Sequence, residues 1–508
     1  MHYRSQDIEK IYDRIKRLAG KALQKEDLAG ALREYDRAAV VASNLNRFFK
    51  DDEIEDKLQV LAERLITKSA GSPKQDNRYI FYDHIGSNYV LALQYLRALM
   101  SWEAEIFYIL EPSRHSTAQP DFIKDLQAYG KARVLILPER TEDKLKDLNQ
   151  VYRSIQEFGA AKALIHAPAE GAFCCVLWNA LDDMQRFRIV PGDHHFYLGT
   201  RLSDYVIEFR DFGLALSHHY RAYKKEQLLC QPYYPVVNRE IPFEGFPPQV
   251  KADSTVIFSG GALYKILGDG GRFLQLSKAL LDYNEKVVLL YAGEGNTVRI
   301  KDFIRKNKLE NRFILLGQRR DIFSLIQNSD IYLGTYPFSG GLMTQLAVLC
   351  EKPLLLLSYF PAIRSADSLL AYGKKAKESL SFYSMEAMLP YSRKLIDDLE
   401  FRRNEGRKNR GRVISPQEFS DSLHSVLKGE VSVDNVPEMP EGLLKKAEDL
   451  YLETADRYTK AYELFLFQSY GLKTLWLFPR VFLKGMGSIS FLRRIAYTAG
   501  KRIKNKRL

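Results

Sequence analysis

The sequence predicts an α/β fold: two doubly wound, Rossmann-like parallel sheets facing a cleft, with an N-terminal helical segment and a basic amphipathic C-terminal tail. Short apolar runs alternate with helical stretches, as parallel strands and their crossover helices do. A break at Pro242, Pro247 and Pro248 separates two such series. The predicted parts are a helical segment (1–75), two Rossmann-like domains (76–245 and 250–428), a connector with a helix (429–470) and a tail (471–508).

The composition is that of a globular protein with sizeable cores. Of the 508 residues, 46% are hydrophobic and 27% are charged, which are ordinary proportions. The four cysteines show no metal-binding spacing and lie in apolar stretches, so we expect buried free thiols in a reducing compartment. The first residues lack the apolar core of a signal peptide, and no run of 18 apolar residues predicts a membrane-spanning helix.

Apolar runs bounded by turn residues predict the strands. In the first series they are 78–82, 105–110, 134–137, 163–166 and 174–177, and in the second 255–258, 286–291, 312–316, 331–333 and 354–357. Before the first series, residues 22–39 resemble one tetratricopeptide-like helix pair. A repeat array needs at least three units, so we expect a helical cap on the next domain rather than a repeat platform.

The stretch from Asp330 to Pro353 combines a short apolar strand, a glycine-rich turn and an apolar helix. The turn brings Gly340, Gly341 and Thr344 to the helix start, where unpaired N–H groups and the helix dipole favour a phosphate. Two adjacent glycines let the backbone approach a ligand closely. The alternative is an ordinary glycine-rich turn of any α/β domain.

Three further glycine loops directly follow strands of the second series, so we expect them at the same sheet edge, where ligands bind. Their candidate binding residues are Gly261, Tyr264, Lys265, Gly293, Glu294 and Gln318. Lys265 would reach a diphosphate as a point charge. The alternative is a solvated loop lysine.

Taken in order, the motifs Gly-Gly-x-x-Tyr-Lys, Ala-Gly-Glu-Gly, Leu-Gly and Asp-Ile-x-Leu-x-Thr-x-Pro-x-x-Gly-Gly-x-x-Thr resemble the nucleotide-sugar domain of GT-B glycosyltransferases. The branch they resemble contains O-linked N-acetylglucosamine transferase and bacterial adhesin and surface-glycan glycosyltransferases. The resemblance covers residues 78–425. It implies that Lys265 and the segment from Gly341 to Thr344 hold the donor, with Ser339 beside them. It also implies a UDP-sugar as donor substrate and no separate cofactor.

The first domain carries a second resemblance. Asp193-His-His-Phe-Tyr-Leu-Gly199 and Glu208-Phe-Arg210 are similar to segments of related bacterial sugar transferases. This implies an acceptor-binding domain, whose acceptor-side residues would be Asp83, Gly86, Asp193, Glu208 and Arg210.

Two departures from the resembled family are informative. Retaining GT-B enzymes have a glutamate where this sequence has Leu346, which favours an inverting transfer. Glu351 stands where that family has glycine, in the turn from the helix to the next strand.

His194 and His195 are the catalytic candidates. Histidine accepts protons near neutral pH, and an inverting transfer needs the acceptor deprotonated as the sugar C1–O bond breaks. His194 occupies the position that the resemblance matches, His195 is the second candidate, and a structural role for the pair is the alternative. No Asp-x-Asp motif follows a strand, so we predict metal independence, with Lys265 and the helix start neutralising the leaving diphosphate.

The net charge of +12 is concentrated in the tail. Residues 464–508 contain ten Lys or Arg and no Asp or Glu, which leaves +2 for the rest of the chain. Because Trp, Phe and Leu are interspersed among these cations, we expect residues 471–508 to lie on an anionic membrane surface. The alternatives are a helix docked on the protein body and, least favoured, an arm that contacts nucleic acid.

We therefore expect a bacterial-type glycosyltransferase of polysaccharide biosynthesis, peripheral at the cytoplasmic face of the membrane. It would move a sugar from a nucleotide sugar to a surface-glycan or lipid-linked acceptor. The alternatives are a cytoplasmic protein glycosyltransferase, suggested by the helical N-terminus, and a GT-B module without catalysis that serves as a binding subunit.

Overall fold

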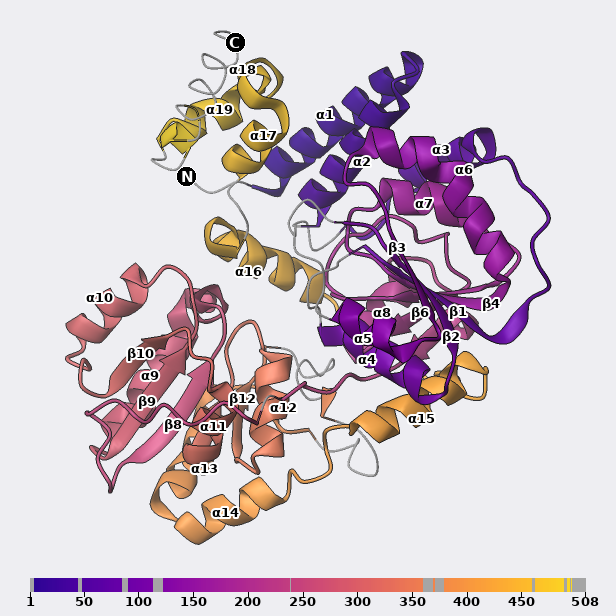
Figure 1. Cartoon of the computed structure of the whole chain (residues 1–508). Coiled ribbons are helices and arrows are strands. Elements are labelled where there is room, and N and C mark those ends of the chain that lie inside the picture. The colour runs from indigo at the N-terminus through magenta and orange to yellow at the C-terminus, as the bar shows by residue number, and fades with distance from the viewer. Residues whose placement is uncertain are drawn as a thin grey trace.

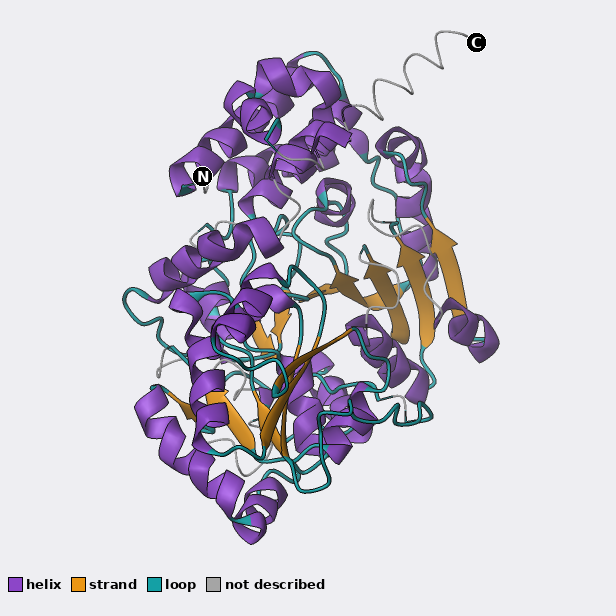
Figure 2. Cartoon of the chain, turned by 90° about the vertical axis from the view of Figure 1, so that its left-hand side faces the viewer, coloured by secondary structure: helices purple, strands orange, loops and turns teal. Residues whose placement is uncertain are grey.

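The computed structural model describes residues 4–43, 48–84, 90–112, 122–237, 239–359, 369–370, 379–458, 462–487, 491–493 and 495. Within these ranges the chain forms two parallel sheets, each with helices on both faces (Figures 1 and 2). This confirms the predicted α/β class with two doubly wound sheets.

The first sheet has the strand order β3-β2-β1-β4-β5-β6-β7, and all its described pairings are parallel. Its strands are β1 (Gln75–Asp83), β2 (Glu105–Leu110), β3 (Ala132–Ile136), β4 (Ala160–His166), β5 (Gln185–Ile189), β6 (Tyr205–Glu208) and β7 (Leu228–Cys230). The helices between them are α4 (Val90–Ser101), α5 (Phe122–Tyr129), α6 (Thr141–Phe158), α7 (Ala172–Asn179) and α8 (Asp211–His219). The order reverses between β1 and β4, and doubly wound sheets bind ligands at such a point.

The second sheet has the order β10-β9-β8-β11-β12-β13. Its strands are β8 (Thr255–Gly260), β9 (Val287–Ala292), β10 (Phe313–Gly317), β11 (Ile331–Leu333), β12 (Leu354–Leu357) and β13 (Ser381–Phe382). Its helices are α9 (Arg272–Tyr283), α10 (Val298–Lys306), α11 (Ile322–Asn328), α12 (Gly341–Leu349), α13 (Met385–Asp397) and α14 (Leu399–Arg407). Strands β9, β11 and β12 are buried throughout, which explains their uninterrupted apolar sequence. The reversal point here lies between β8 and β11.

One predicted strand is wrong, because residues 174–177 belong to helix α7. A short apolar run does not distinguish a buried strand from a buried helix. A residue remote in the sequence caps this helix: the amides of Gly171 and Ala172 donate to Oδ1 of Asp36, at 3.0 and 2.8 Å. Since Asp36 lies far away in the sequence, no local pattern indicates this helix start.

The turn between α12 and β12 forms without the glycine of the resembled family. Glu351 occupies it with a φ of 52°, in the left-handed region that normally favours glycine. Nε of Arg410 donates to the Glu351 carboxylate at 2.9 Å. The substitution therefore leaves the predicted helix-to-strand connection in place.

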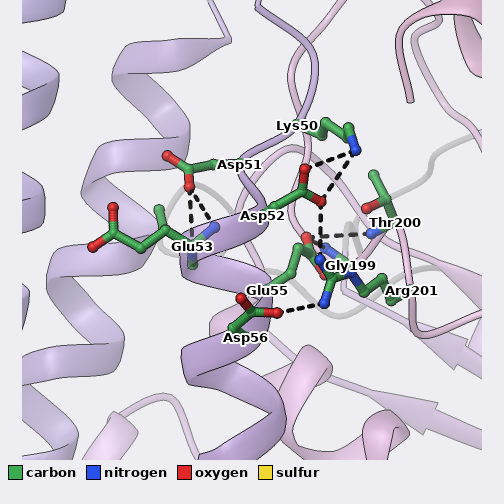
Figure 3. A network of polar contacts seen from close by, with 10 residues as sticks. Lys50, Asp51, Asp52, Glu53, Glu55, Asp56, Gly199, Thr200 and Arg201 are labelled. Carbon is green, nitrogen blue, oxygen red and sulfur yellow. Dashed lines mark hydrogen bonds and ion pairs between the residues drawn. The ribbon is translucent and has the colours of Figure 1, made fainter. Parts of the chain in front are cut away.

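The N-terminal helices α1 (Ser5–Gln24), α2 (Leu28–Ala42) and α3 (Asp52–Leu65) pack on the first sheet's side of the molecule (Figure 1). The buried carboxylate of Glu55 in α3 accepts from the amides of Gly199, at 2.7 Å, and Thr200, at 3.3 Å (Figure 3). Beside it, Arg201 pairs with acidic side chains of α3. These helices therefore hold the loop after β5 in place, as a cap would.

After the second sheet, α15 (Pro416–Leu427) returns to the first one and packs against α4. Phe419 brings its ring to 5.2 Å from Tyr95 and 5.5 Å from Tyr234, measured between ring centroids. The helix starts with a capping box between Ser415 and Glu418, a common helix-start signal. Helix α16 (Leu443–Tyr458) then lies between the two sheet regions (Figure 1).

The described part of the tail is docked on the body of the protein. After α17 (Tyr462–Tyr470), the tail forms α18 (Thr474–Leu477) and α19 (Pro479–Gly485). Phe478 and Val481 are buried in the same core as the N-terminal helices, and Nη2 of Arg14 donates to the carbonyl of Trp476 at 3.3 Å. This supports the docking alternative for these residues, whereas 488–490, 494 and 496–508 lie outside the described part. No described helix is both long and apolar enough to cross a bilayer.

Candidate functional site

The loop after β8 positions the predicted donor-binding lysine. Gly261 has a φ of 138°, which side-chain-bearing residues rarely adopt, and it leads the chain into a short 3₁₀ helix at Leu263–Ile266 that contains Lys265. In the neighbouring loop after β9, a Cβ at Gly293 would lie 1.9 Å from the carbonyl oxygen of Gly261. The two loops therefore pass each other in backbone contact, and both positions require glycine.

The amine of Lys265 is largely buried, and no described residue forms a hydrogen bond or ion pair with it. Burial, and then the positive charge of Arg210, lower the pKa of Lys265. Arg210 follows β6 of the first sheet, so two cations from opposite sides of the cleft lie close together. Because a buried charge without a counter-charge is costly, this arrangement suits an anionic ligand.

The glycine-rich loop after β11 contributes Ser339 and leads into α12. The hydroxyl of Thr335 donates to the carbonyl of Phe338 at 2.6 Å and holds the loop. Thr344 is only 1% exposed, and its hydroxyl donates to the carbonyl of Gly340 at 3.0 Å. The threonine predicted to donate to a phosphate therefore uses its hydrogen bond inside the first turn of the helix.

Four other predicted donor residues lie along the same sheet edge but not in the lining of the cavity that Lys265 and His194 share. Glu294 and Gln318 are exposed, in the loops after β9 and β10. Gly340 and Gly341 form the start of α12, and a Cβ at Gly341 would lie 2.5 Å from the side chain of Leu369. Their assigned roles remain predictions.

On the first sheet's side, the loop after β5 presents an oriented histidine. Asp193 is fully buried, and Nη2 of Arg210 donates to its Oδ1 at 2.9 Å. Burial alone would raise the pKa of Asp193, but Arg210 and then His194 outweigh it and lower that pKa. Nδ1 of His194 lies 3.5 Å from the same carboxylate oxygen. Nε2 is shielded from solvent without a hydrogen-bond partner among the described residues, so it is the ring's available basic atom.

His195 lies beside His194, with 3.8 Å between the ring centroids. Its Nδ1 is 3.1 Å from the carbonyl oxygen of Ser43, and its side chain does not line the cavity. Burial, and then the neighbouring His194, lower the pKa of His195 to about 3. Burial also lowers the pKa of His194, although Asp193 opposes it. Both rings are therefore neutral at neutral pH, the state that accepts a proton.

Glu208 supports this loop from behind and does not reach the cavity. It is fully buried, accepts from the hydroxyl of Ser217 at 2.5 Å, and lies 3.5 Å from Nη1 of Arg221. Nη2 of Arg221 donates to the carbonyls of Asp193 and His195, at 2.5 and 2.7 Å. Burial raises the pKa of Glu208 to about 7. The structure thus places Glu208 as a support for the histidine loop.

Asp83 also lies outside the cavity. It ends β1, is fully buried, and accepts from the hydroxyl of Tyr108 at 2.9 Å, while Nδ1 of His166 lies 3.1 Å from its other oxygen. Gly86, the remaining acceptor-side candidate, lies outside the described residues.

Residues of both sheet regions and of α16 line a partly open cavity of about 140 Å³. From the predicted set it brings together Tyr264, Lys265, Ser339, His194 and Arg210. Sequence reasoning missed the rest of the lining, which is mainly aromatic and apolar: Phe49, Phe212, Pro337, Phe338, Ser358, Tyr359, Leu443, Leu444, Ala447 and Tyr451. The four residues of α16 recur at helical spacing, which indicates a packed helix face but not what it packs against.

Among the described residues, no group of three or more His, Cys, Asp or Glu side chains is arranged to hold a metal ion. Metal independence stays a prediction.

No protein-family model and no curated protein matches the sequence. Solved structures do match. The O-GlcNAc transferase of Thermobaculum terrenum, solved as a mutant, is 15% identical with a TM-score of 0.54, over 88% of this chain and 83% of its own. A glycosyltransferase from Rickettsia africae is 12% identical with a TM-score of 0.51, over 70% of this chain and 98% of its own. HepE from Anabaena, solved with UDP-glucose, is 15% identical with a TM-score of 0.47, over 69% of this chain and 99% of its own.

At these identities the likeness is one of fold. The two parallel sheets, each with a point where the strand order reverses, are consistent with it. The chain therefore has the two-domain GT-B fold found in glycosyltransferases.

Proposed function

We propose that this protein is a glycosyltransferase that moves a sugar from a nucleotide-sugar donor to an acceptor hydroxyl. One observation carries the proposal: an unpaired, buried Lys265 shares a cavity with His194, which Asp193 orients. A cation without a counter-charge fits a diphosphate, and a neutral, oriented imidazole fits a proton acceptor. These are the two functions that transfer from a nucleotide sugar requires.

The proposed reaction is a direct displacement. Nε2 of His194 takes the proton of the acceptor hydroxyl while the acceptor oxygen bonds to C1 of the sugar. The bond from C1 to the diphosphate oxygen breaks, and the diphosphate leaves with the electron pair. Lys265 and the N–H groups at the start of α12 stabilise the charge that develops on it. Attack from the opposite side inverts the anomeric configuration, in agreement with Leu346 at the position where retaining enzymes have glutamate.

We propose UDP as the nucleotide, on the strength of the resemblance of the second domain to the branch with O-linked N-acetylglucosamine transferase. Lys265 and the α12 start would handle the diphosphate charge without a metal ion.

The described part of the tail supports a lipid-linked acceptor at a membrane surface. Between 39 and 79% of each of these apolar side chains remains exposed after docking: Leu472, Leu475, Trp476, Leu483, Met486 and Leu492. The same segment carries cations, including Lys473 and Arg480, and no acidic residue. Apolar and cationic side chains together suit the interface of an anionic bilayer, and we place the protein peripherally at the cytoplasmic face.

A protein acceptor is the second candidate. It is favoured by the N-terminal helical cap beside the cleft, from which Phe49, just before α3, reaches the cavity lining. The tail patch favours the lipid-linked acceptor over it. The third alternative, a binding subunit without catalysis, is disfavoured by the oriented His194 opposite Lys265.

The test is a screen of nucleotide-sugar hydrolysis across uridine, guanosine and adenosine donors, with calorimetry of the matching diphosphates. We expect turnover of a UDP-sugar, undiminished by a metal chelator, and an inverted product anomer by NMR. Transfer to lipid-linked rather than peptide acceptors would separate the first two candidates. Binding of no nucleotide by any form of the protein would favour the subunit.

A further inference from the structure

Helix α16 bridges the cleft rather than packing on one side of it. On the second sheet's side, Nζ of Lys446 lies 2.7 Å from Oδ1 of Asp269, and the Asp269 amide donates to Glu453 at 3.0 Å. On the other side, Leu443 packs against Ala215 of α8. The hydroxyl of Ser5, at the start of α1, donates to Glu448 at 2.9 Å. The helix is therefore anchored on both walls of the cleft and on the N-terminal cap.

Tyr451 projects from α16 to the proposed reaction site. Its ring stacks on His194, with 5.1 Å between centroids and 13° between planes. It also lies 4.5 Å from the ring of Phe338, in the loop that carries Ser339. Tyr451 thus connects the histidine loop of the first sheet with the glycine-rich loop of the second.

The space that α16 leaves between Lys265 and His194 is small. The cavity has a volume of about 140 Å³, whereas sites for ligands of the proposed donor's size have roughly 300–1,000 Å³. Four residues of its lining belong to α16: Leu443, Leu444, Ala447 and Tyr451. With α16 in this position, Tyr451 and its neighbours on the helix take up room beside both Lys265 and His194.

We propose that α16 is an intramolecular latch that closes the donor site, with the ring of Tyr451 occupying space between His194 and Phe338 that a substrate needs. This inference rests on the proposed function, because the ligand it excludes is a nucleotide sugar. Polar contacts and small apolar contacts hold α16 in the cleft. A nucleotide that binds at the site replaces some of these contacts with its own. The connector between α15 and α16 contains Gly429 and Gly442 with φ values of 74° and 76°, and it has no regular helix or strand that would resist a displacement.

A disulfide between positions 268 and 454 tests the latch in the full-length chain. A Cβ built at Gly268 contacts the side chain of Thr454 in α16, 3.5 Å from its Cγ2, so cysteines at these two positions would lie next to each other. The double variant Gly268→Cys, Thr454→Cys should therefore cross-link when oxidised and hold α16 in place. UDP affinity is measured by calorimetry in the oxidised and reduced forms. The single variant Gly268→Cys is the matched control, because its Cβ also approaches Pro337, at 3.0 Å.

We expect UDP to bind the oxidised double variant about tenfold more weakly, or worse, than the reduced one, since locking removes the competent population. The control should not respond to oxidation. Tyr451→Ala should bind UDP several-fold more tightly than the unmodified protein. Equal UDP affinity in the oxidised and reduced forms of the cross-linked double variant, or unchanged UDP affinity in Tyr451→Ala, would overturn the latch while leaving the glycosyltransferase proposal intact. Absence of binding of UDP, GDP and ADP in every form, Tyr451→Ala included, would overturn both.

Discussion

The two walls of the cavity handle buried charge in opposite ways. On the first sheet's side, Asp193 is paired with Arg210, and Arg221 lies beside Glu208 while its guanidinium binds the carbonyls of the histidine loop. On the second sheet's side, Lys265 is buried with no such partner among the described residues. The first wall is internally neutralised, and the second keeps an unsatisfied positive charge.

This difference indicates which wall does what. Paired charges with several hydrogen bonds restrict side-chain rotamers, so they suit a wall that must hold one histidine in one orientation. An unpaired cation destabilises the free protein and gains its counter-charge only when an anion binds. We therefore interpret the first wall as the preorganised chemical side and the second as the binding side.

The largest expected effect is on the chemical side. His194→Ala should lower the turnover number by about 10²- to 10⁴-fold, as loss of a general base does, while UDP affinity stays within a few fold. His195→Ala is the matched control, because its ring faces the Ser43 carbonyl outside the cavity. If His194→Ala keeps its turnover and His195→Ala is inactive, the two roles are exchanged; if both remain active, the base lies elsewhere.

The second prediction compares stability on the two walls. Arg210→Met leaves the buried Asp193 carboxylate without its cation, so we expect a loss of about 3–5 kcal/mol in the free energy of unfolding. Lys265→Met removes a buried charge that has no partner, so it should be neutral or stabilising. Urea denaturation of both variants measures this. Equal destabilisation by the two substitutions would remove the distinction between the walls.

The third prediction concerns donor binding. Lys265→Ala should weaken UDP binding by about 1.5–3 kcal/mol, or about 10- to 150-fold, since a charge-assisted contact is lost. Thr344→Val should have a smaller effect, because its hydroxyl is bonded to the Gly340 carbonyl. Lys286→Ala, an exposed lysine at the start of β9, is the control. Unchanged UDP affinity in Lys265→Ala would remove the diphosphate assignment.

The fourth prediction tests the tail without unfolding it. Truncation after Tyr470 would uncover the core that receives Phe478 and Val481, so exposed positions are the better target. The double variant Trp476→Ser, Leu483→Ser should reduce co-sedimentation with anionic vesicles by about tenfold or more, because two apolar insertions are lost. Val298→Ser, an exposed apolar position in α10, is the control.

The unmodified protein should be released only in part as salt rises, since screening over a Debye length of about 10 Å at 0.1 M weakens lipid attraction but not apolar insertion. Equal sedimentation of the double variant and the control would contradict the membrane assignment.

The smallest expected effect is in the pH profile. Burial, opposed by Asp193, lowers the pKa of His194 from its ordinary value near 6.5, so half of the rings are protonated only at a pH below 6.5. The fall of kcat/KM towards acidic pH should therefore be centred below pH 6.5. Glu208, whose pKa is raised to about 7, is the control: Glu208→Gln should leave this acidic limb in place. If the fall in kcat/KM is instead centred above pH 6.5 and disappears in Glu208→Gln, the titrating group is Glu208 and not His194.

Most of the fold and a third of the cavity lining, five of its 15 residues, could be predicted from the sequence. Buried parallel strands are apolar on both faces, so apolar runs such as 286–291 and 354–357 can be recognised as strands. Lys265, Ser339 and His194 follow strands of the two sheets, and the carboxyl ends of parallel strands meet at one edge. The short apolar run at 174–177 was wrongly predicted as a strand. Its helical conformation could not be recognised locally, because the contact that starts α7 comes from Asp36.

By itself, the sequence determined the two doubly wound sheets, the glycine loops at their ligand edges and the concentration of positive charge in the tail. Periodicity, turn chemistry and composition are local properties, and each is written within a few residues. The tertiary structure alone decided that α16 crosses the cleft, that Tyr451 stacks on His194, and that Phe478 and Val481 join the N-terminal core. These contacts join segments hundreds of positions apart in the sequence. The amphipathic pattern of a helix indicates that its apolar face is buried, but it does not identify the segment that packs against that face.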